Sequence, residues 1–339
     1  MSEERTSVRP RCRSLTGVRI LSTGSYVPEI VVTNDQLHER LGFDSDWIVK
    51  RTGILERRHA LPQQATSDLS IEAAKRCMDR AGVTPRDIDL CLVGTFTPDF
   101  SFPSTACMVQ DRLKLACPAV DIQAACAGFM YALITGAAYV AAGVSELALI
   151  IGADTNSRVI NPDDIKTYPL FGDGAGAVLL TRGRPDQGIL SYNLGADGAG
   201  GDLLIRSACG SRLPPTPELL AEKKHYMYMD GRAVFRWAVS MLCDTIQDVL
   251  KHSSKKPEDV DLYIPHQANI RIINAAIDVL NIPRSKVFNN LEKYGNTSAG
   301  SVPLALDEAV AEGRVKENDL VVLSGFGAGL TWGTALMRW

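Results

Sequence analysis

The sequence predicts an α/β protein made of two related halves that stack in layers. The main sign is an internal repeat, since Thr84–Val93 ("TPRDIDLCLV") matches Lys256–Pro265 ("KPEDVDLYIP") at four positions, 172 residues apart. The same offset places Cys126-Ala127-Gly128 on Ser298-Ala299-Gly300. Each triplet opens a helical stretch that leads to an apolar run typical of a buried strand. Two matches at one offset indicate a duplicated unit of strands and helices.

Composition agrees with a globular protein and excludes two classes of partner. The 339 residues are 45% hydrophobic and 22% charged, with a formal net charge of −3. Such a charge gives no basic surface for nucleic acid, and no basic amphipathic helix indicates a membrane surface. The apolar run Ala127–Gly143 is shorter than the about 20 residues that span a bilayer. We therefore expect neither a nucleic-acid nor a membrane partner.

Three segments are expected along the chain. Residues 1–16 should form a flexible extension, because they lack the apolar segment of a secretion signal. The N-terminal half is expected over residues 17–185 and the C-terminal half over residues 186–339. The boundary lies in Thr181–Gly188 ("TRGRPDQG"), where Gly and Pro interrupt the pattern. The eight cysteines form no CxxC pair, which is typical of reduced thiols and predicts a cytoplasmic protein.

The helix after Cys126 has no polar face. Ala127–Gly143 carries no charged residue, whereas a helix at the surface is polar on one side. When two α/β halves pack together, the helices between them contact protein on both sides. We therefore expect this helix between the layers. Its counterpart, from Ala299 to about Glu312, is more amphipathic and should begin buried and end at the surface.

Cys126 stands where a strand turns into this helix. The first N–H groups of a helix lack partners within it, and the helix dipole adds partial positive charge there. Both effects would lower the pKa of the thiol and favour a nucleophile. A buried structural cysteine is the alternative interpretation, so the assignment depends on finding partners for Cys126.

Two candidate partners lie in the second half. His266 follows the strand-like "DLYIP", at the carboxyl end of a predicted central strand, where open α/β sheets place their chemistry. Asn296 lies two residues before Ser298, the duplicate of Cys126. The duplication therefore predicts that Cys126, His266 and Asn296 stand on loops at the same end of the sheets.

Four blocks of sequence resemble the β-ketoacyl-acyl carrier protein synthase III family: "DIQAACAGF", "IPHQANIRI", "YGNTSAGSVP" and "GFGAGLTWG". The likeness runs from about Gly17 to Trp339. It implies the thiolase fold, a duplicated α/β/α/β/α layered architecture. It also implies the condensation that starts type II fatty acid synthesis, with an acyl-CoA, expected to be acetyl-CoA, and malonyl-acyl carrier protein as substrates. No cofactor and no metal are implied.

The resemblance implies a role for each candidate. Cys126 would take the acyl group as a thioester. His266 and Asn296 would donate hydrogen bonds to the malonyl thioester oxygen during decarboxylation, and the backbone N–H groups of Cys126 and Ala328 would form the oxyanion hole. His266 would have to be neutral, so condensation would fall as the pH drops through its pKa, about 6.5 when unperturbed.

The resemblance also implies residues that bind coenzyme A. Trp47 and Arg51 match positions that stack on the adenine and bind phosphate. Ile165 stands where the family often has an arginine on the other face of the adenine, which predicts a weaker or different clamp.

Partner contacts follow from the same resemblance. Arg236, Gln267 and Arg271 match positions that meet the acyl carrier protein. Phe102 matches a residue that reaches across a homodimer to the end of the acyl pocket, so a homodimer is expected.

Other functions stay open. Ile165, and Cys209 in "IRSACGSRLPP", leave room for a specialised ketosynthase or acyltransferase of secondary metabolism with a different primer or acceptor. A Cys-His-Asn set also serves papain-like hydrolases, although their cysteine context is missing here. A binding protein that kept the fold is the third alternative. The absence of a second histidine in "YGNTSAG" and of a cysteine in "GFGAG" distinguishes the chain from elongating synthases and thiolases, and favours the initiating synthase.

Overall fold

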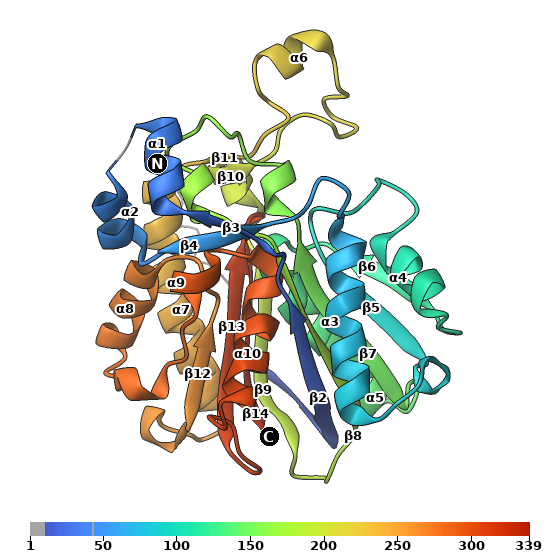
Figure 1. Ribbon diagram of the computed structural model, residues 1–339. Coiled ribbons are helices and arrows are strands. Elements are labelled where there is room, and N and C mark those ends of the chain that lie inside the picture. The colour runs from blue at the N-terminus through green and yellow to red at the C-terminus, as the bar shows by residue number, and fades with distance from the viewer. Residues whose placement is uncertain (1–10, 43) are drawn as a thin grey trace, which may run out of the picture.

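The computed structural model describes residues 11–42 and 44–339 (Figure 1). Two sheets, each of five strands among the described residues, dominate it. In sheet order, the first consists of β2 (Val18–Tyr26), β8 (Gly174–Arg182), β7 (Leu147–Asp154), β5 (Leu90–Gly94) and β6 (Ala119–Ile122). The second consists of β1 (Arg13–Thr16), β9 (Gly188–Ala196), β14 (Thr331–Arg338), β13 (Leu320–Gly327) and β12 (Leu262–Pro265).

The two sheets correspond strand by strand. In the first, β5 and β7 are parallel and β8 is antiparallel to both of its neighbours. In the second, β12 and β13 are parallel and β14 is antiparallel to both of its neighbours. The order β2-β8-β7-β5 therefore repeats as β9-β14-β13-β12, which confirms the predicted duplication. The predicted boundary between residues 185 and 186 falls in the turn between β8 and β9.

Helices complete five layers. One pair covers the outer face of the first sheet, a second pair lies between the sheets, and a third covers the outer face of the second sheet. In that order the pairs are α3 (Thr66–Ala81) with α4 (Thr105–Leu113), α5 (Gly128–Ala141) with α10 (Ser301–Ala311), and α7 (Gly231–His252) with α8 (Ile270–Val279). This is the α/β/α/β/α arrangement that the sequence predicts.

The central layer explains the apolar helix. Phe129, Leu133 and Ala137 of α5 are fully buried in one cluster with Val178 of the first sheet and Val321 of the second. Each large apolar side chain removed from water stabilises the folded protein by about 1.5–3 kcal/mol. A helix that is covered on both sides can therefore carry apolar residues on every face. The exposed residues of the helix, Ala138 and Tyr139, lie near its end.

Helix α10 begins buried and ends exposed, as its sequence predicts. Its Asp307 accepts hydrogen bonds from the hydroxyl groups of Thr23 and Ser25 on β2, at 2.6 and 2.7 Å. The same carboxylate forms an ion pair with Arg80 of α3. These bonds tie a helix of the second half to the first sheet.

The predicted N-terminal extension is partly wrong. Residues 1–10 lie outside the described residues, but Arg13–Thr16 form β1, antiparallel to β9. Leu15 packs against the central cluster, and the Ser14 hydroxyl donates to the carbonyl oxygen of Leu190 at 2.8 Å. β1 pairs with the edge of β9, whose backbone N–H and C=O groups would otherwise lack a partner strand on that side. Four residues carry too little pattern to predict such a strand.

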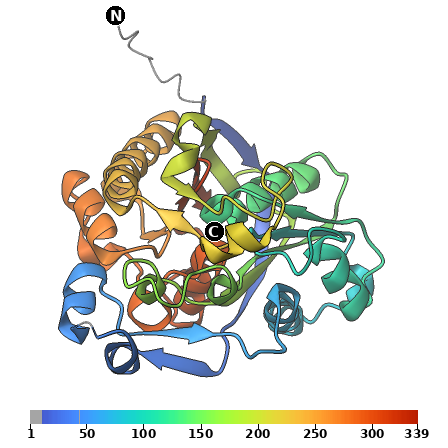
Figure 2. The same cartoon turned by 90° about the horizontal axis from the view of Figure 1, so that it is seen from above.

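The remaining elements gather at one end of the two sheets (Figures 1 and 2). They are β3 (Ile30–Thr33), α1 (Asn34–Leu41), α2 (Ser45–Thr52), β4 (Glu56–His59), β10 (Leu204–Ile205), α6 (Pro217–Ala221), β11 (Tyr228–Met229) and α9 (Leu291–Tyr294). Over the described ranges, no helix combines the length and apolar character needed to cross a membrane. The loops that carry Cys126, His266 and Asn296 lie at this same end.

Candidate active site

Cys126 sits on a sharp turn between β6 and α5. The preceding residue, Ala125, has φ of 46°, a left-handed conformation that few non-glycine residues adopt. A short 3-10 turn, Ala125–Ala127, then leads directly into α5. The Sγ of Cys126 accepts a hydrogen bond from the Ser298 hydroxyl at 3.2 Å. The cysteine and its duplicate therefore meet where the two halves pack together.

The expected low pKa of Cys126 is wrong. Burial raises the pKa of this thiol to about 12, and the nearby Asp154 carboxylate raises it further, whereas the Ser298 hydrogen bond opposes the shift. Burial disfavours the charged form of a thiol because a thiolate loses its contact with water. The thiol of the free protein is therefore protonated at neutral pH.

His266 follows β12 directly and is buried. Its Nδ1 lies 2.6 Å from the Ser301 hydroxyl oxygen, and the edge of its ring meets Phe326 with centroids 5.0 Å apart. Burial lowers the pKa of His266 to about 3, so the imidazole is neutral at physiological pH. Its Nε2 has no hydrogen-bond partner among the residues that the structure describes, and the residue lines the pocket.

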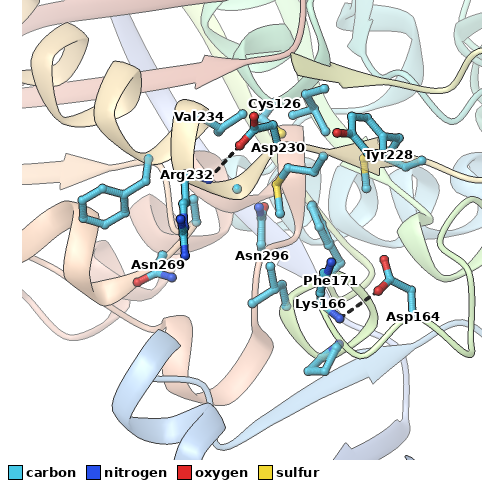
Figure 3. A pocket seen from close by; sticks show the side chains of 18 of the residues that line it. Cys126, Asp164, Lys166, Phe171, Tyr228, Asp230, Arg232, Val234, Asn269 and Asn296 are labelled. Atoms are coloured by element: carbon cyan, nitrogen blue, oxygen red, sulfur yellow. Dashed lines mark hydrogen bonds between the residues drawn. The ribbon is translucent and has the colours of Figure 1, made fainter. Parts of the chain in front are cut away.

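Asn296 follows α9 and is held by its backbone. Its N–H donates to Leu170 and its carbonyl accepts from Gly172, at 2.8 and 3.0 Å. Its side-chain Oδ1 accepts from the backbone N–H of Ser298 at 2.8 Å. Because Oδ1 must be the acceptor there, Nδ2 is the end that faces the pocket (Figure 3).

One pocket of about 1370 Å³ contains all three side chains. Cys126, His266 and Asn296 are buried residues of its lining, and the duplication predicts that they meet at one end of the sheets. Its outer part carries cationic side chains, with Lys166 and Arg232 on either side in Figure 3. The site combines a thiol, two neutral side chains that can donate hydrogen bonds, and a positively charged mouth.

Gly327 faces the nucleophile. A Cβ on this residue would stand 2.6 Å from the backbone nitrogen of Cys126, closer than real Cβ atoms approach another heavy atom. Only glycine leaves room beside that N–H for a substrate oxygen. Ala328 is the next residue, half-buried in the turn from β13 to β14.

Asp154 is a residue of the site that the sequence analysis missed. It is fully buried at the end of β7 and accepts hydrogen bonds from the Thr95 hydroxyl at 2.8 Å and the backbone N–H of Ala299 at 3.0 Å. Burial raises the pKa of its carboxyl group. It thus joins the loop after β5 to the turn that begins at Ser298. Its place at the carboxyl end of a central strand was the available signal.

Trp47 and Arg51 lie at the mouth of the pocket. Both belong to α2, and the Arg51 guanidinium carbon is 5.1 Å from the centre of the Trp47 ring. Ile165 and Lys166 line the same mouth, and Ile165 is exposed. The aromatic ring and the branched apolar side chain therefore belong to one opening.

Of the three residues expected to meet a carrier protein, two are at the surface. Arg236 of α7 and Arg271 of α8 are exposed at the mouth. The predicted contact of Gln267 with a carrier protein is wrong, because the side chain of Gln267 is buried. Its Nε2 donates to the carbonyl oxygen of Pro265 at 2.6 Å, and its Oε1 accepts from the backbone N–H of Asn290 at 3.1 Å. Its amide group makes hydrogen bonds within the protein and cannot contact a partner.

Phe102 lies far out on the loop after β5. Its exposed fraction is 84%, and it does not line the pocket of its own chain. Phe100 and Val120 of β6 are also exposed. The backbone N–H groups of Thr105 and Ala106 donate to Asp121 of β6, both at 2.7 Å, so this loop is anchored beside an edge strand.

Comparisons with known proteins agree with this geometry. Residues 120–198 match the family described as 3-oxoacyl-[acyl-carrier-protein] synthase III, and residues 250–339 match its C-terminal part. A β-ketoacyl-[acyl-carrier-protein] synthase III of Rhodopirellula baltica is 54% identical over 96% of this chain and 99% of its own. One of Natranaerobius thermophilus is 46% identical over 96% and 100%. The crystal structure of 3-oxoacyl-[acyl-carrier-protein] synthase III from Aquifex aeolicus superposes with a TM-score of 0.89 at 42% identity, covering 95% and 100%.

Proposed function

The chain belongs to the 3-oxoacyl-[acyl-carrier-protein] synthase III family, and from this premise we propose that it condenses an acyl-CoA primer with malonyl-acyl carrier protein. Acetyl-CoA is the expected primer, and the reaction starts type II fatty acid synthesis. The observation that carries the proposal is the meeting of Cys126, His266 and Asn296 in one pocket. The curated relatives at 46–54% identity bear the name of this enzyme, and no observation favours secondary metabolism.

Acyl loading is the first half of the proposed reaction. A bond forms between the Sγ of Cys126 and the acyl carbon, and the bond from that carbon to the sulfur of coenzyme A breaks. The proton of the Cys126 thiol ends on the departing coenzyme A. The backbone N–H groups of Cys126 and Ala328 would stabilise the oxyanion, in the space that Gly327 keeps open.

Condensation is the second half. The bond from the malonyl α-carbon to its carboxylate breaks, carbon dioxide leaves, and the electron pair becomes an enolate. The Nε2–H of His266 and the Nδ2–H of Asn296 would donate to its oxygen. The α-carbon then attacks the acyl group, and Cys126 leaves as the thiolate and takes up a proton from water. Because the carboxylate supplies the electron pair, this proposed chemistry uses no cofactor and no metal.

The mouth of the pocket suits both substrates. Trp47 offers an aromatic face for adenine, Ile165 an apolar surface for its other face, and Arg51 a positive charge for phosphate. Arg236 and Arg271 would attract an acidic carrier protein, because opposite surface charges draw two proteins together. Such charges raise the association rate more than the affinity. Reduced thiols and soluble substrates support a cytoplasmic location.

The proposal is tested by separating the half-reactions. After mixing with acetyl-CoA, intact-protein mass spectrometry should show one stable acetyl adduct, which malonyl-acyl carrier protein then discharges to a β-ketoacyl product. A scan of primers, from acetyl to long and branched acyl-CoA, gives the primer preference. Rapid release of free acid would indicate a hydrolase, and no adduct with any acyl-CoA would indicate a binding protein.

A homodimer through β6 is part of the same proposal. β6 is an edge strand of the first sheet, and edge strands tend to be paired or covered. Val120 of β6 and the loop residues Phe100 and Phe102 are exposed, and exposed apolar residues are typical of an interface. Phe102 would then enter the partner's acyl pocket, which accounts for its distance from its own.

Replacing Phe102 with Ala is expected to shift primer preference toward longer chains, because a shorter side chain leaves room at the end of the pocket. One or two extra methylene groups should become tolerated, which corresponds to about tenfold in the ratio of kcat/KM values for butanoyl-CoA and acetyl-CoA. Val279→Ala, which alters an exposed apolar residue on α8, is the control. A fully active monomer in sedimentation, or an unchanged ratio, would contradict the proposal.

Condensation is expected to stay constant from pH 8 to pH 5.5 as far as His266 is concerned. The neutral imidazole is the active form, and its pKa is lowered to about 3, so it remains neutral throughout this range. The fall near pH 6.5 that an unperturbed histidine predicts should therefore be absent. The measurement is carbon dioxide release by enzyme already loaded with acetyl, with circular dichroism to monitor folding. A midpoint near pH 6.5 that disappears in His266→Ala would contradict it.

A further inference from the structure

The Nδ1 atom of His266, which does not face the substrate in the proposed reaction, lies against the hydroxyl group of Ser301. Ser301 is the first residue of α10, and both it and His266 are about 1% exposed. The 2.6 Å between the Ser301 oxygen and Nδ1 is a short hydrogen bond. The backbone N–H of Gln267 also points at the Ser301 oxygen, at 3.4 Å.

The hydrogen positions follow from counting donors and acceptors. A serine hydroxyl has one proton to donate and two lone pairs. The Gln267 N–H uses one lone pair of Ser301, and His266 Nδ1 is the one acceptor for the Ser301 proton among the described residues. If Nδ1 carried a proton instead, the buried hydroxyl proton would be left without an acceptor, which is unfavourable inside a protein.

We propose that Ser301 is a positioning residue that holds His266 in the tautomer with its proton on Nε2. The inference rests on the proposed function, in which Nε2–H donates to the malonyl thioester oxygen. The Nε2–H group would then be ready to donate to the thioester oxygen when condensation begins, and no proton would have to move between the ring nitrogens first. Preorganised donors of this kind stabilise developing charge most effectively.

The second donor is fixed by the same segment. The Ser298 backbone N–H holds the acceptor end of the Asn296 amide, and the Ser301 hydroxyl holds the acceptor end of the His266 ring. Phe326 fixes the plane of the ring through its edge contact. One turn at the beginning of α10 therefore directs the N–H groups of both side chains into the pocket.

The matched pair Ser301→Thr and Ser301→Val tests this assignment. Both variants add bulk and branch at Cβ, but only threonine keeps the hydroxyl. In Ser301→Val the rate of carbon dioxide release from acetyl-loaded enzyme should fall about tenfold, since a hydrogen bond of about 1.4 kcal/mol corresponds to that factor. Ser301→Thr should restore most of this loss. Acetyl loading should differ between the pair by less than condensation does.

A spectroscopic measurement reports the tautomer directly. In histidine labelled with ¹⁵N, the protonated and unprotonated ring nitrogens have well-separated shifts, and His266→Gln assigns the signals. Wild type and Ser301→Thr should show protonated Nε2, and Ser301→Val should show a mixture of tautomers. Protonated Nδ1 in the wild type would overturn the proposal whether or not the variants fold.

The outcomes distinguish the two levels of inference. Equal condensation rates in Ser301→Thr and Ser301→Val, or an unchanged tautomer in Ser301→Val, would refute the role of Ser301 alone. Normal condensation in His266→Ala would instead refute the role of His266 in the proposed function.

Discussion

Cys126→Ser is expected to lose acyl loading by at least about 1000-fold, because an alcohol is a far weaker nucleophile than a thiol and no strong base is positioned to activate it. The environment makes the loss severe. Burial already raises the pKa of the thiol to about 12, and the pKa of His266 is lowered to about 3, so neither group favours the charged state. The fold should persist, because oxygen replaces sulfur in a site where Ser298 is already a polar neighbour.

Intact-protein mass spectrometry after mixing with acetyl-CoA measures this directly. Cys107→Ser is the control, since Cys107 is exposed on α4. It should load like the wild type. Loading by Cys126→Ser at the wild-type rate would mean that another residue is the nucleophile.

Asn296→Ala is expected to load acetyl normally while condensation falls about 100- to 1000-fold, the usual loss when one donor to a developing oxyanion is removed. Loading places charge on the primer oxygen, near the backbone of Cys126. Decarboxylation places it on a different oxygen, that of the malonyl thioester, to which Nδ2 of Asn296 would donate. The two steps should therefore respond differently.

A second variant separates the donor from the structural role of Asn296. Its Oδ1 also holds the backbone N–H of Ser298, which alanine would release. Asn296→Asp keeps an acceptor for that N–H but offers no donor to the pocket. Single-turnover measurements of acyl-enzyme formation and carbon dioxide release should show that both variants fail in condensation. Rescue by Asn296→Asp, or equal loss of both steps in Asn296→Ala, would identify a purely structural residue.

The sequence predicts the fold well because a repeat is a property of the chain itself. The offset between Pro85 and Pro257 is enough to place β5 and β12, and the carboxyl ends of such strands locate Cys126 and His266. Asn296 follows from its distance to the duplicate of the cysteine. None of these inferences depends on contacts between the halves.

What the sequence could not predict depends on contacts between residues that are far apart in the chain. The pKa values of Cys126 and His266 shift because the folded protein buries both side chains away from water, which no local pattern encodes. Ser301 reaches His266 across 35 positions of the chain, and Asp154 reaches Ala299 across 145. Gln267 looks like a surface residue beside the exposed Arg271, but the loop turns its side chain inward.

The contact between Cys126 and Ser298 bears on how such a protein could arise. A single unit assembling with its own copy would place one residue type on both sides of the symmetry axis. The 3.2 Å between the sulfur and the hydroxyl leaves no room there for two acyl groups. Two identical nucleophiles at this point would obstruct each other. Joining the copies in one gene frees each position to change alone, so that one keeps the thiol and the other becomes its hydrogen-bond donor. A tandem duplication thus allows two equivalent positions to carry different side chains, a thiol and the hydroxyl that donates to it.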